Sequence, residues 1–207
     1  MIIAPWFYAA AVPAILLTGI SKGGFAGGIG LVAVPLMALT ISPVQAAGIM
    51  LPILIVMDMM GVWAYRRSFD RLNLIYLLPG AAVGIGIGTL LAGTVEDDHV
   101  RLLVGLIAVL FVANYLFGHV AERPPSGPGK IRGTIWGMIG GFTSFVAHAG
   151  SPPFQIYMLP QRPDKTIYVG TSVMFFTIVN LIKLPAYASL GQLADRKSTR
   201  LNSSHLG

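Results

Sequence analysis

Long stretches of this chain carry no charged side chain, and this pattern constrains the fold more than any other feature. Among residues 1–65 only Lys22 and Asp58 are charged, and residues 72–95 and 133–161 carry no charge at all. A helix needs roughly 20 apolar residues to cross the hydrocarbon core of a bilayer. In lipid such a segment must be helical, because its backbone groups can only satisfy one another. The sequence therefore predicts an all-α, polytopic integral membrane protein.

The composition argues against the main soluble alternatives. Charged residues make up 11% of the 207 residues and hydrophobic residues 55%, whereas a soluble domain carries about 25% charged residues. The chain has no cysteine, so we expect neither disulfides nor a thiolate metal site. Its net charge of +6 resides mainly in loops, which is typical of the positive-inside bias and not of a nucleic-acid binder. We expect a multi-pass protein of the cytoplasmic membrane without metal or cofactor.

The interruptions between apolar stretches predict about six to eight helical membrane segments. The first stretch, residues 2–39, is too long for one span. It contains five glycines within residues 21–30, and because glycine destabilises helices, we expect a break or a tight helix–loop–helix there. The further predicted segments are residues 43–65, 72–93, 100–118, 133–160 and 165–190.

The charges of the loops predict an orientation. Residues 66–71 and the linker 119–132 are basic, so both are expected on the cytoplasmic side, and the acidic residues 96–98 on the outer side. The short loop 161–165 is also basic. It shares the cytoplasmic side only if the segment before it enters the membrane and returns, as a hairpin broken at residues 148–153.

A shift of 122 residues brings the two ends of the chain into register. The matching pairs are Gly19 with Gly141, Gly28 with Gly150, Gly48 with Gly170, Asp58 with Asn180 and Tyr65 with Tyr187. Paired segments interrupted by glycine or proline in two halves indicate the binding site of a secondary transporter. We expect one transporter domain over residues 1–194, with halves at about 1–118 and 131–194, the second incomplete and inverted relative to the first. Chance agreement among many glycines is the alternative.

The last thirteen residues differ from the rest of the chain. Residues 195–207 are polar and follow no membrane pattern, and residues 195–205 resemble the translation of a sequencing-library adapter. We therefore expect a non-native tail in place of the native C-terminus. A genuine cytosolic tail is the alternative.

Several short motifs point together to one family. They are the glycine cluster at 23–28 followed by Val34-Pro35, the helix start at Pro79-Gly80-Ala81, the block 148–153, and the pair formed by 170–172 and Asn180. Their order and spacing, over about Leu17 to Gly191, resemble the sulfite exporter TauE/SafE family of membrane transporters. The resemblance implies export of a small sulfur-containing anion, such as sulfite or an organosulfonate. We expect an ion gradient or the membrane potential to drive this export. Ser151 departs from the family by interrupting a run of glycines, and the family's final helices are absent.

Both breaks are candidate anion sites. Exposed N–H groups at helix N-termini favour anions, and glycine leaves such groups uncovered. Hydroxyl and amide side chains near the breaks can add hydrogen bonds. Alternatively, these residues only pack helices together. The expected substrate-binding residues are Lys22, Gly23, Gly24, Gly27, Gly28, His148, Gly150, Ser151, Pro152, Gln155, Thr171, Ser172 and Asn180.

Four ionisable residues lie within the apolar segments. A lysine in lipid is costly and is a functional candidate by default, which applies to Lys22 unless it reaches an interface. Lys183 is expected either to attract the anion or to pair with Asp58. Histidine as a residue type titrates near neutral pH, so His148 is a candidate proton relay, with a plain helix contact as the alternative.

Two other functions compete with a carrier. A passive anion channel is hard to separate from a carrier by sequence. An intramembrane enzyme would need paired catalytic groups, and only Ser144 and His148, four residues apart on one helix face, suggest such a pair. There is no ATP-binding loop of the GxxxxGK[ST] type. We therefore expect a transporter and not an enzyme, with a small anion and the lipid bilayer as partners and a homo-oligomer left open.

Overall fold

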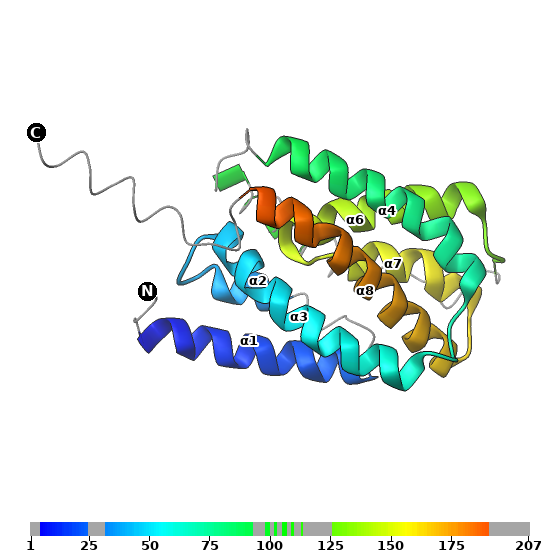
Figure 1. The fold of residues 1–207 in the computed structure, drawn as a ribbon, viewed down its shortest axis with the longest axis horizontal. Helices are drawn as coiled ribbons and strands as arrows, with labels where there is room; N and C mark the ends of the chain where they lie inside the picture. The colour runs from blue at the N-terminus through cyan, green and yellow to red at the C-terminus, as the bar shows by residue number, and fades with distance from the viewer. Residues whose placement is uncertain are drawn as a thin grey trace, which may run out of the picture.

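The structure, a computed structural model, describes residues 5–24, 32–92 and 126–190, together with a few isolated residues between 98 and 113. In these three ranges the regular structure is entirely helical, which confirms the predicted all-α class (Figure 1). Most of the predicted span 100–118, and all of the tail 195–207, lie outside the described residues. The helices are α1 (Pro5–Gly24), α2 (Ala33–Met37), α3 (Pro43–Tyr65), α4 (Arg71–Leu91), α6 (Lys130–Ala147), α7 (Ser151–Met158), the 3-10 helix η3 (Leu159–Gln161) and α8 (Lys165–Ser189).

Several of these helices suit a bilayer by length and composition. Among the described residues, α3, α4 and α8 are long and apolar enough to cross a membrane, and α1 is apolar from Trp6 to Lys22. Large apolar side chains also cover their outward faces, such as Met60 and Trp63 on α3, which are 73% and 74% exposed. An outer surface of this kind matches lipid and not water.

The predicted break in the first apolar stretch is present. Helix α1 ends at Gly24 and the short α2 begins at Ala33. Val34 and Met37 of α2 lie in one buried apolar cluster with Ala14 of α1, so the chain turns back on itself after α1. This is the helix–loop–helix expected from the glycines.

The second predicted break is a hairpin made of α6 and α7. Helix α6 ends at Ala147, and α7 begins four residues later at Ser151. The backbone N–H of Ser126, just before α6, donates to the carbonyl of Pro160, just after α7, at 3.0 Å. The hairpin therefore enters and leaves at the same end of the molecule, as the basic loop 161–165 required.

A seam of glycines joins α4 to α6. Gly80 and Gly84 of α4 lie against backbone of α6, and Gly137 and Gly141 of α6 lie against backbone of α4. A methyl group added at any of the four would overlap a carbonyl oxygen of the facing helix. Glycines spaced four apart share one helix face, and in lipid such small residues let two backbones approach closely. The glycines of residues 80–88 thus bring α4 into direct backbone contact with α6.

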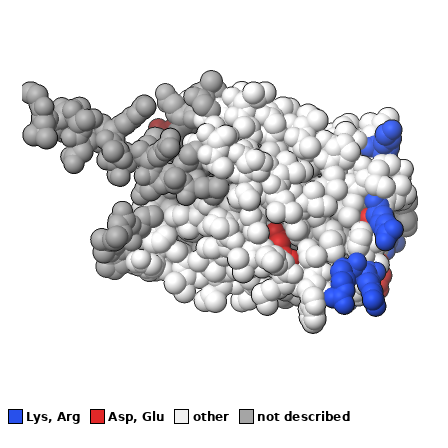
Figure 2. Space-filling view, in the orientation of Figure 1, with Lys and Arg blue, Asp and Glu red and all other residues white. Residues whose placement is uncertain are grey.

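The basic loops all lie at one end of the molecule. Figure 2 shows Lys and Arg side chains gathered there, while the rest of the visible face is nearly free of charge. Its exposed cations are Arg66, Arg67, Arg71, Lys130, Arg132, Arg162 and Lys165. This basic end unites the three loops that the sequence predicted to share one side of the membrane.

A polar network holds the loop before α4 to the second half of the chain at this basic end. Asp70 caps α4 by accepting from the backbone N–H of Asn73, and its own N–H donates to Thr171 Oγ1 of α8 at 2.8 Å. The amide of Asn73 donates to Gln161 Oε1 at 2.9 Å and accepts from Tyr157 OH at 2.7 Å. Asn73 and Tyr157 are buried, so the hydrogen bonds of this network take the place of those that their polar groups would otherwise make to water.

Replacing Asp70 with alanine is expected to lower the free energy of unfolding by about 1–2 kcal/mol, the usual effect of losing a helix N-cap. The loss should lie at the upper end of that range, because Asp70 Oδ2 also accepts from the buried Asn73 amide at 2.8 Å. Titration with a denaturing detergent, followed by circular dichroism, measures the change. Asp164→Ala is the matched control. Asp164 caps α8 through Thr166 N–H, a bond that lowers the pKa of its exposed carboxyl. An equal loss in both variants would contradict a role for the wider network.

Candidate functional site

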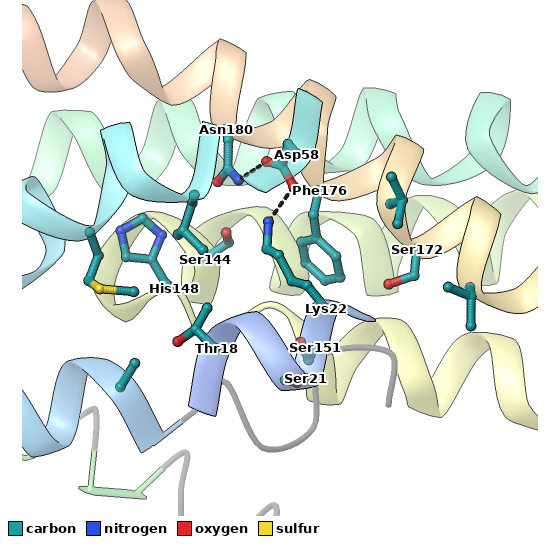
Figure 3. Close-up of a pocket in the computed structure, with 15 residues that line it drawn as sticks. Thr18, Ser21, Lys22, Asp58, Ser144, His148, Ser151, Ser172, Phe176 and Asn180 are labelled. Atoms are coloured by element: carbon teal, nitrogen blue, oxygen red, sulfur yellow. Dashed lines mark hydrogen bonds and ion pairs between the residues drawn. The ribbon is translucent and has the colours of Figure 1, made fainter. Parts of the chain in front are cut away.

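A cavity of about 60 Å³ lies between α1, α3, the α6–α7 hairpin and α8 (Figure 3). One water molecule needs roughly 10–15 Å³ of such space, so the cavity can hold several waters or one small oxyanion. Met50, Leu54 and Phe176 supply much of its apolar wall. The polar residues that line it are Thr18, Ser21, Lys22, Asp58, Ser144, His148, Ser151, Ser172 and Asn180.

An ion pair crosses this cavity. Lys22 extends from the last turn of α1 and bonds Asp58 Oδ1 of α3 (Figure 3). Asp58 Oδ2 accepts a second hydrogen bond, from the amide of Asn180 on α8, at 2.6 Å. The side chain of Asp58 is 3% exposed and that of Lys22 is 22% exposed. Three helices therefore meet through one carboxylate, and the cation lies at a helix C-terminus, where the helix dipole favours positive charge.

A second lysine is buried behind the cavity wall. Lys183 of α8 is completely buried, and its Nζ lies 3.1 Å from both the carbonyl oxygen and the Oγ of Ser144. The same Nζ lies 2.8 Å from His148 Nδ1. Ser144 and His148, which the sequence suggested as a catalytic pair, thus both contact this lysine.

The break between α6 and α7 positions the imidazole of His148. His148 has the left-handed backbone conformation, with φ 53°, which histidine adopts more readily than most residues. Its N–H donates to Ser144 O at 3.0 Å, which closes the end of α6. Its ring Nε2 reaches Ala47 O of α3 at 2.9 Å. Pro152 follows in the first turn of α7, as expected for a new helix.

Part of the predicted substrate-binding set lies on the cavity wall. Lys22, His148, Ser151, Ser172 and Asn180 line it, together with Asp58 from the expected charge pair. The expected pair of Asp58 with Lys183 is wrong, because Asp58 bonds Lys22 and Asn180 while Lys183 bonds the α6–α7 break.

Other members of that set lie elsewhere. Thr171 is at the basic end, where its hydroxyl donates to Ile167 O at 2.6 Å and accepts from Asp70 N. Gly150 packs against the backbone of Gly140. Pro152 and Gln155 of α7 are not among the residues that line the cavity.

The glycines after Lys22 do not have the expected geometry. Gly23 and Gly24 are the last residues of α1, so they belong to a helix C-terminus, whose free groups are carbonyls and not N–H donors. They therefore provide no half-helix N-terminus for an anion. Gly27 and Gly28 lie outside the described residues.

Sequence reasoning missed two polar residues of α1. Thr18 and Ser21 line the cavity together with Lys22, Thr18 one helical turn before the lysine and Ser21 directly before it. Thr18 satisfies its hydroxyl on Ala14 O at 2.8 Å. Ser21 is completely buried, and its Oγ has no hydrogen-bond partner among the described residues. The signal available in the sequence was the polar pair Ser21-Lys22 at the end of an otherwise apolar segment.

Comparison with known proteins identifies one match. A family model described as Sulfite exporter TauE/SafE matches residues 11–196, which is most of the chain. Neither the comparison with curated proteins nor that with solved structures found a match to this chain. Among the described residues, no three His, Asp or Glu side chains converge as metal ligands.

Proposed function

The chain belongs to the sulfite exporter TauE/SafE family of membrane transporters, and we propose that it exports a small sulfur-containing anion which it binds beside Lys22. The observation that carries this proposal is the lysine cation on the wall of the cavity. Lys22 is the ionisable group of α1 that reaches the cavity. A charged side chain within the membrane-embedded part of a protein costs free energy. Such a residue is therefore a candidate for a functional role by default.

The neighbours of Lys22 supply the other groups that an oxyanion needs. Ser21 Oγ lacks a partner, and Ser151 and Ser172 line the same cavity. Each hydroxyl can donate one hydrogen bond to a sulfonate or sulfite oxygen. Charge-assisted bonds of this kind are about twice as strong as neutral ones. The site thus offers one cation and several hydroxyl donors to a single tetrahedral or pyramidal anion.

The arrangement of the helices supports alternating access by two inverted halves. A shift of 122 residues places α3 at 165–187, close to the observed bounds of α8, Lys165–Ser189. The same shift places α1 at 127–146, close to those of α6, Lys130–Ala147. The paired helices run in opposite directions, as Figure 1 shows for α3 and α8. Inverted repeats around a central site are the usual architecture of such carriers.

The same shift of 122 relates residues across the cavity. Lys22 corresponds to Ser144, and both line it. Asp58 corresponds to Asn180, and these two side chains bond each other. A residue that contacts its own counterpart lies near the axis relating two halves. The cavity is therefore centred where a carrier of this design binds its substrate.

The charge pattern favours outward movement of an anion from the cytoplasm. The basic end, which has seven exposed cations among the described residues, is assigned to the cytoplasm by the positive-inside rule. With the cell interior negative, the membrane potential favours exit of an anion by about 2.3 kcal/mol per charge per 100 mV. Export from the cytoplasmic membrane thus needs no ATP.

Efflux of sulfite from proteoliposomes tests this function. We expect saturable efflux that follows the imposed potential or proton gradient, and a loss of at least about 100-fold in Lys22→Ala, because the anion loses its cation inside a low-dielectric site. Lys165→Ala is the matched control, since Lys165 is exposed at the basic end. His148→Ala is expected to reduce efflux less, because His148 contacts Lys183 and not Lys22.

Two results would contradict the proposal. Absence of efflux for sulfite and for a panel of organosulfonates, from correctly folded protein, would exclude an exporter of this class. Efflux that increases linearly with sulfite, without saturation or exchange, would identify a passive channel instead of a carrier.

A further inference from the structure

We propose that the cavity accepts singly charged anions, such as bisulfite or a simple alkylsulfonate, in preference to doubly charged ones. The proposal rests on the proposed function, since it specifies the charge of the anion that the cavity binds. It follows from the charges that the described residues place in and behind the cavity wall.

The ionisable groups at this place are few. Among the described residues they are Lys22, Asp58, Lys183 and His148, with the ring of Tyr187 packed beside His148. Lys22 and Asp58 form an ion pair and cancel each other. The net charge therefore depends on the unit formed by Lys183 and His148.

Lys183 adds at most one positive charge. Its Nζ lies within 3.1 Å of the carbonyl and hydroxyl oxygens of Ser144 and of His148 Nδ1. An ammonium can donate to all three, whereas a neutral amine can donate to two of them and accept from the Ser144 hydroxyl. Among the described residues, no carboxylate bonds Nζ of Lys183. The unit that it forms with His148 therefore carries one positive charge or none.

The bonds of His148 indicate that its ring is neutral. Its Nε2 faces the carbonyl oxygen of Ala47 at 2.9 Å, and a carbonyl only accepts, so Nε2 carries the hydrogen. Its Nδ1 then accepts from Lys183. If a proton on Lys183 moves to Nδ1, the charge moves with it, so the unit never carries more than one positive charge.

Among the described residues, these charges therefore sum to no more than one positive charge. A divalent anion leaves at least one uncompensated negative charge, and always one more than a monovalent anion leaves. An unpaired charge away from water is strongly unfavourable. The neutral hydroxyls of Ser21, Ser151 and Ser172 can donate hydrogen bonds to an anion, but they do not alter the net charge of the site. Asp58 determines the preference for monovalent anions, because its negative charge already neutralises that of Lys22 in the ion pair (Figure 3).

Binding of two anions of nearly the same shape tests the inference. Methanesulfonate and sulfate are both tetrahedral and keep charges of minus one and minus two at neutral pH. Calorimetry on the protein in nanodiscs is expected to show methanesulfonate bound at least about ten-fold more tightly than sulfate. Asp58→Asn adds one net positive charge and should shift the ratio toward sulfate by a similar factor.

The controls separate charge from packing. Asp58→Glu keeps the charge and should keep the preference for methanesulfonate, and Asp164→Asn, which changes an exposed carboxyl at the basic end, should leave both affinities unchanged. Sulfate bound as tightly as methanesulfonate by the wild-type protein would overturn the inference while leaving the anion carrier intact, and this holds even if Asp58→Asn does not fold. If the wild-type protein binds neither of these anions nor sulfite, the proposed function itself fails.

Discussion

Replacing Gly84 with leucine is expected to prevent the transporter from folding. Gly84 lies in the seam between α4 and α6, where even a methyl group would overlap the carbonyl oxygen of Met138. The neighbour is backbone and cannot rotate away, so the two helices must separate along their length. We expect the free energy of unfolding to fall by at least roughly 3 kcal/mol, the upper range for overpacking. The yield of monodisperse protein on size-exclusion chromatography and the detergent-induced unfolding midpoint measure the effect.

Gly86 is the matched control for this change. It lies two residues further along α4, is exposed, and has nothing within 4 Å of an added Cβ atom. A leucine there faces lipid and improves the helix propensity of α4. Gly86→Leu should therefore yield at least as much folded protein as the wild type. Equal damage at both positions would show that helix propensity or insertion, and not the seam, limits folding.

Breaking the Lys22–Asp58 ion pair from one side is expected to destabilise the protein by about 3–5 kcal/mol, the usual effect of leaving a buried charge without its partner. Lys22→Met should cost more than Asp58→Leu. Asp58 is 3% exposed, whereas Lys22 is 22% exposed and can turn toward water. Unfolding midpoints of both single variants, measured in the same micelle, provide the comparison.

The double variant Lys22→Met with Asp58→Leu decides whether the pair stabilises the fold. Apolar replacement of both members of a buried pair is often neutral or stabilising, so most of the lost stability should return. Anion efflux should stay absent, because the cation is gone. Additive losses in the double variant would mean that the two residues act independently of each other.

The helices and their breaks were predictable from local features. Charge-free stretches identify membrane helices because the cost of burying charge in lipid dominates every other preference. The start of α8 at Lys165 follows from the capping residue Asp164. The break at residues 148–153 was predicted from the nearby basic loop 161–165, which requires the segment before it to enter the membrane and return. These features depend on residues close in sequence, so one sequence suffices to recognise them.

The partners within the site were less predictable. The sequence identified Lys22, Asp58 and Lys183 as ionisable groups within apolar segments, but the partner that it offered as one alternative for Lys183, Asp58, bonds Lys22 instead. Lys22 and Asp58 are 36 residues apart, and their meeting depends on how α1 packs against α3. Similarly, the unpartnered hydroxyl of Ser21 is visible only once its neighbours are placed. Serine is common in helices, so its type alone carries little information.

The glycine seam also determines which parts of the transporter can move. Two backbones in direct contact cannot slide in small steps, because each glycine sits against a carbonyl of the facing helix. Helices α4 and α6 must therefore travel as one rigid body, and α7 travels with them through the buried contact of Tyr157 with Gly133 and Asn73. The contacts left free to change during a transport cycle are the bonds across the cavity, above all Lys22–Asp58 and Asp58–Asn180. In the proposed carrier, the side chains that change partners during transport are therefore the ones that line the anion site.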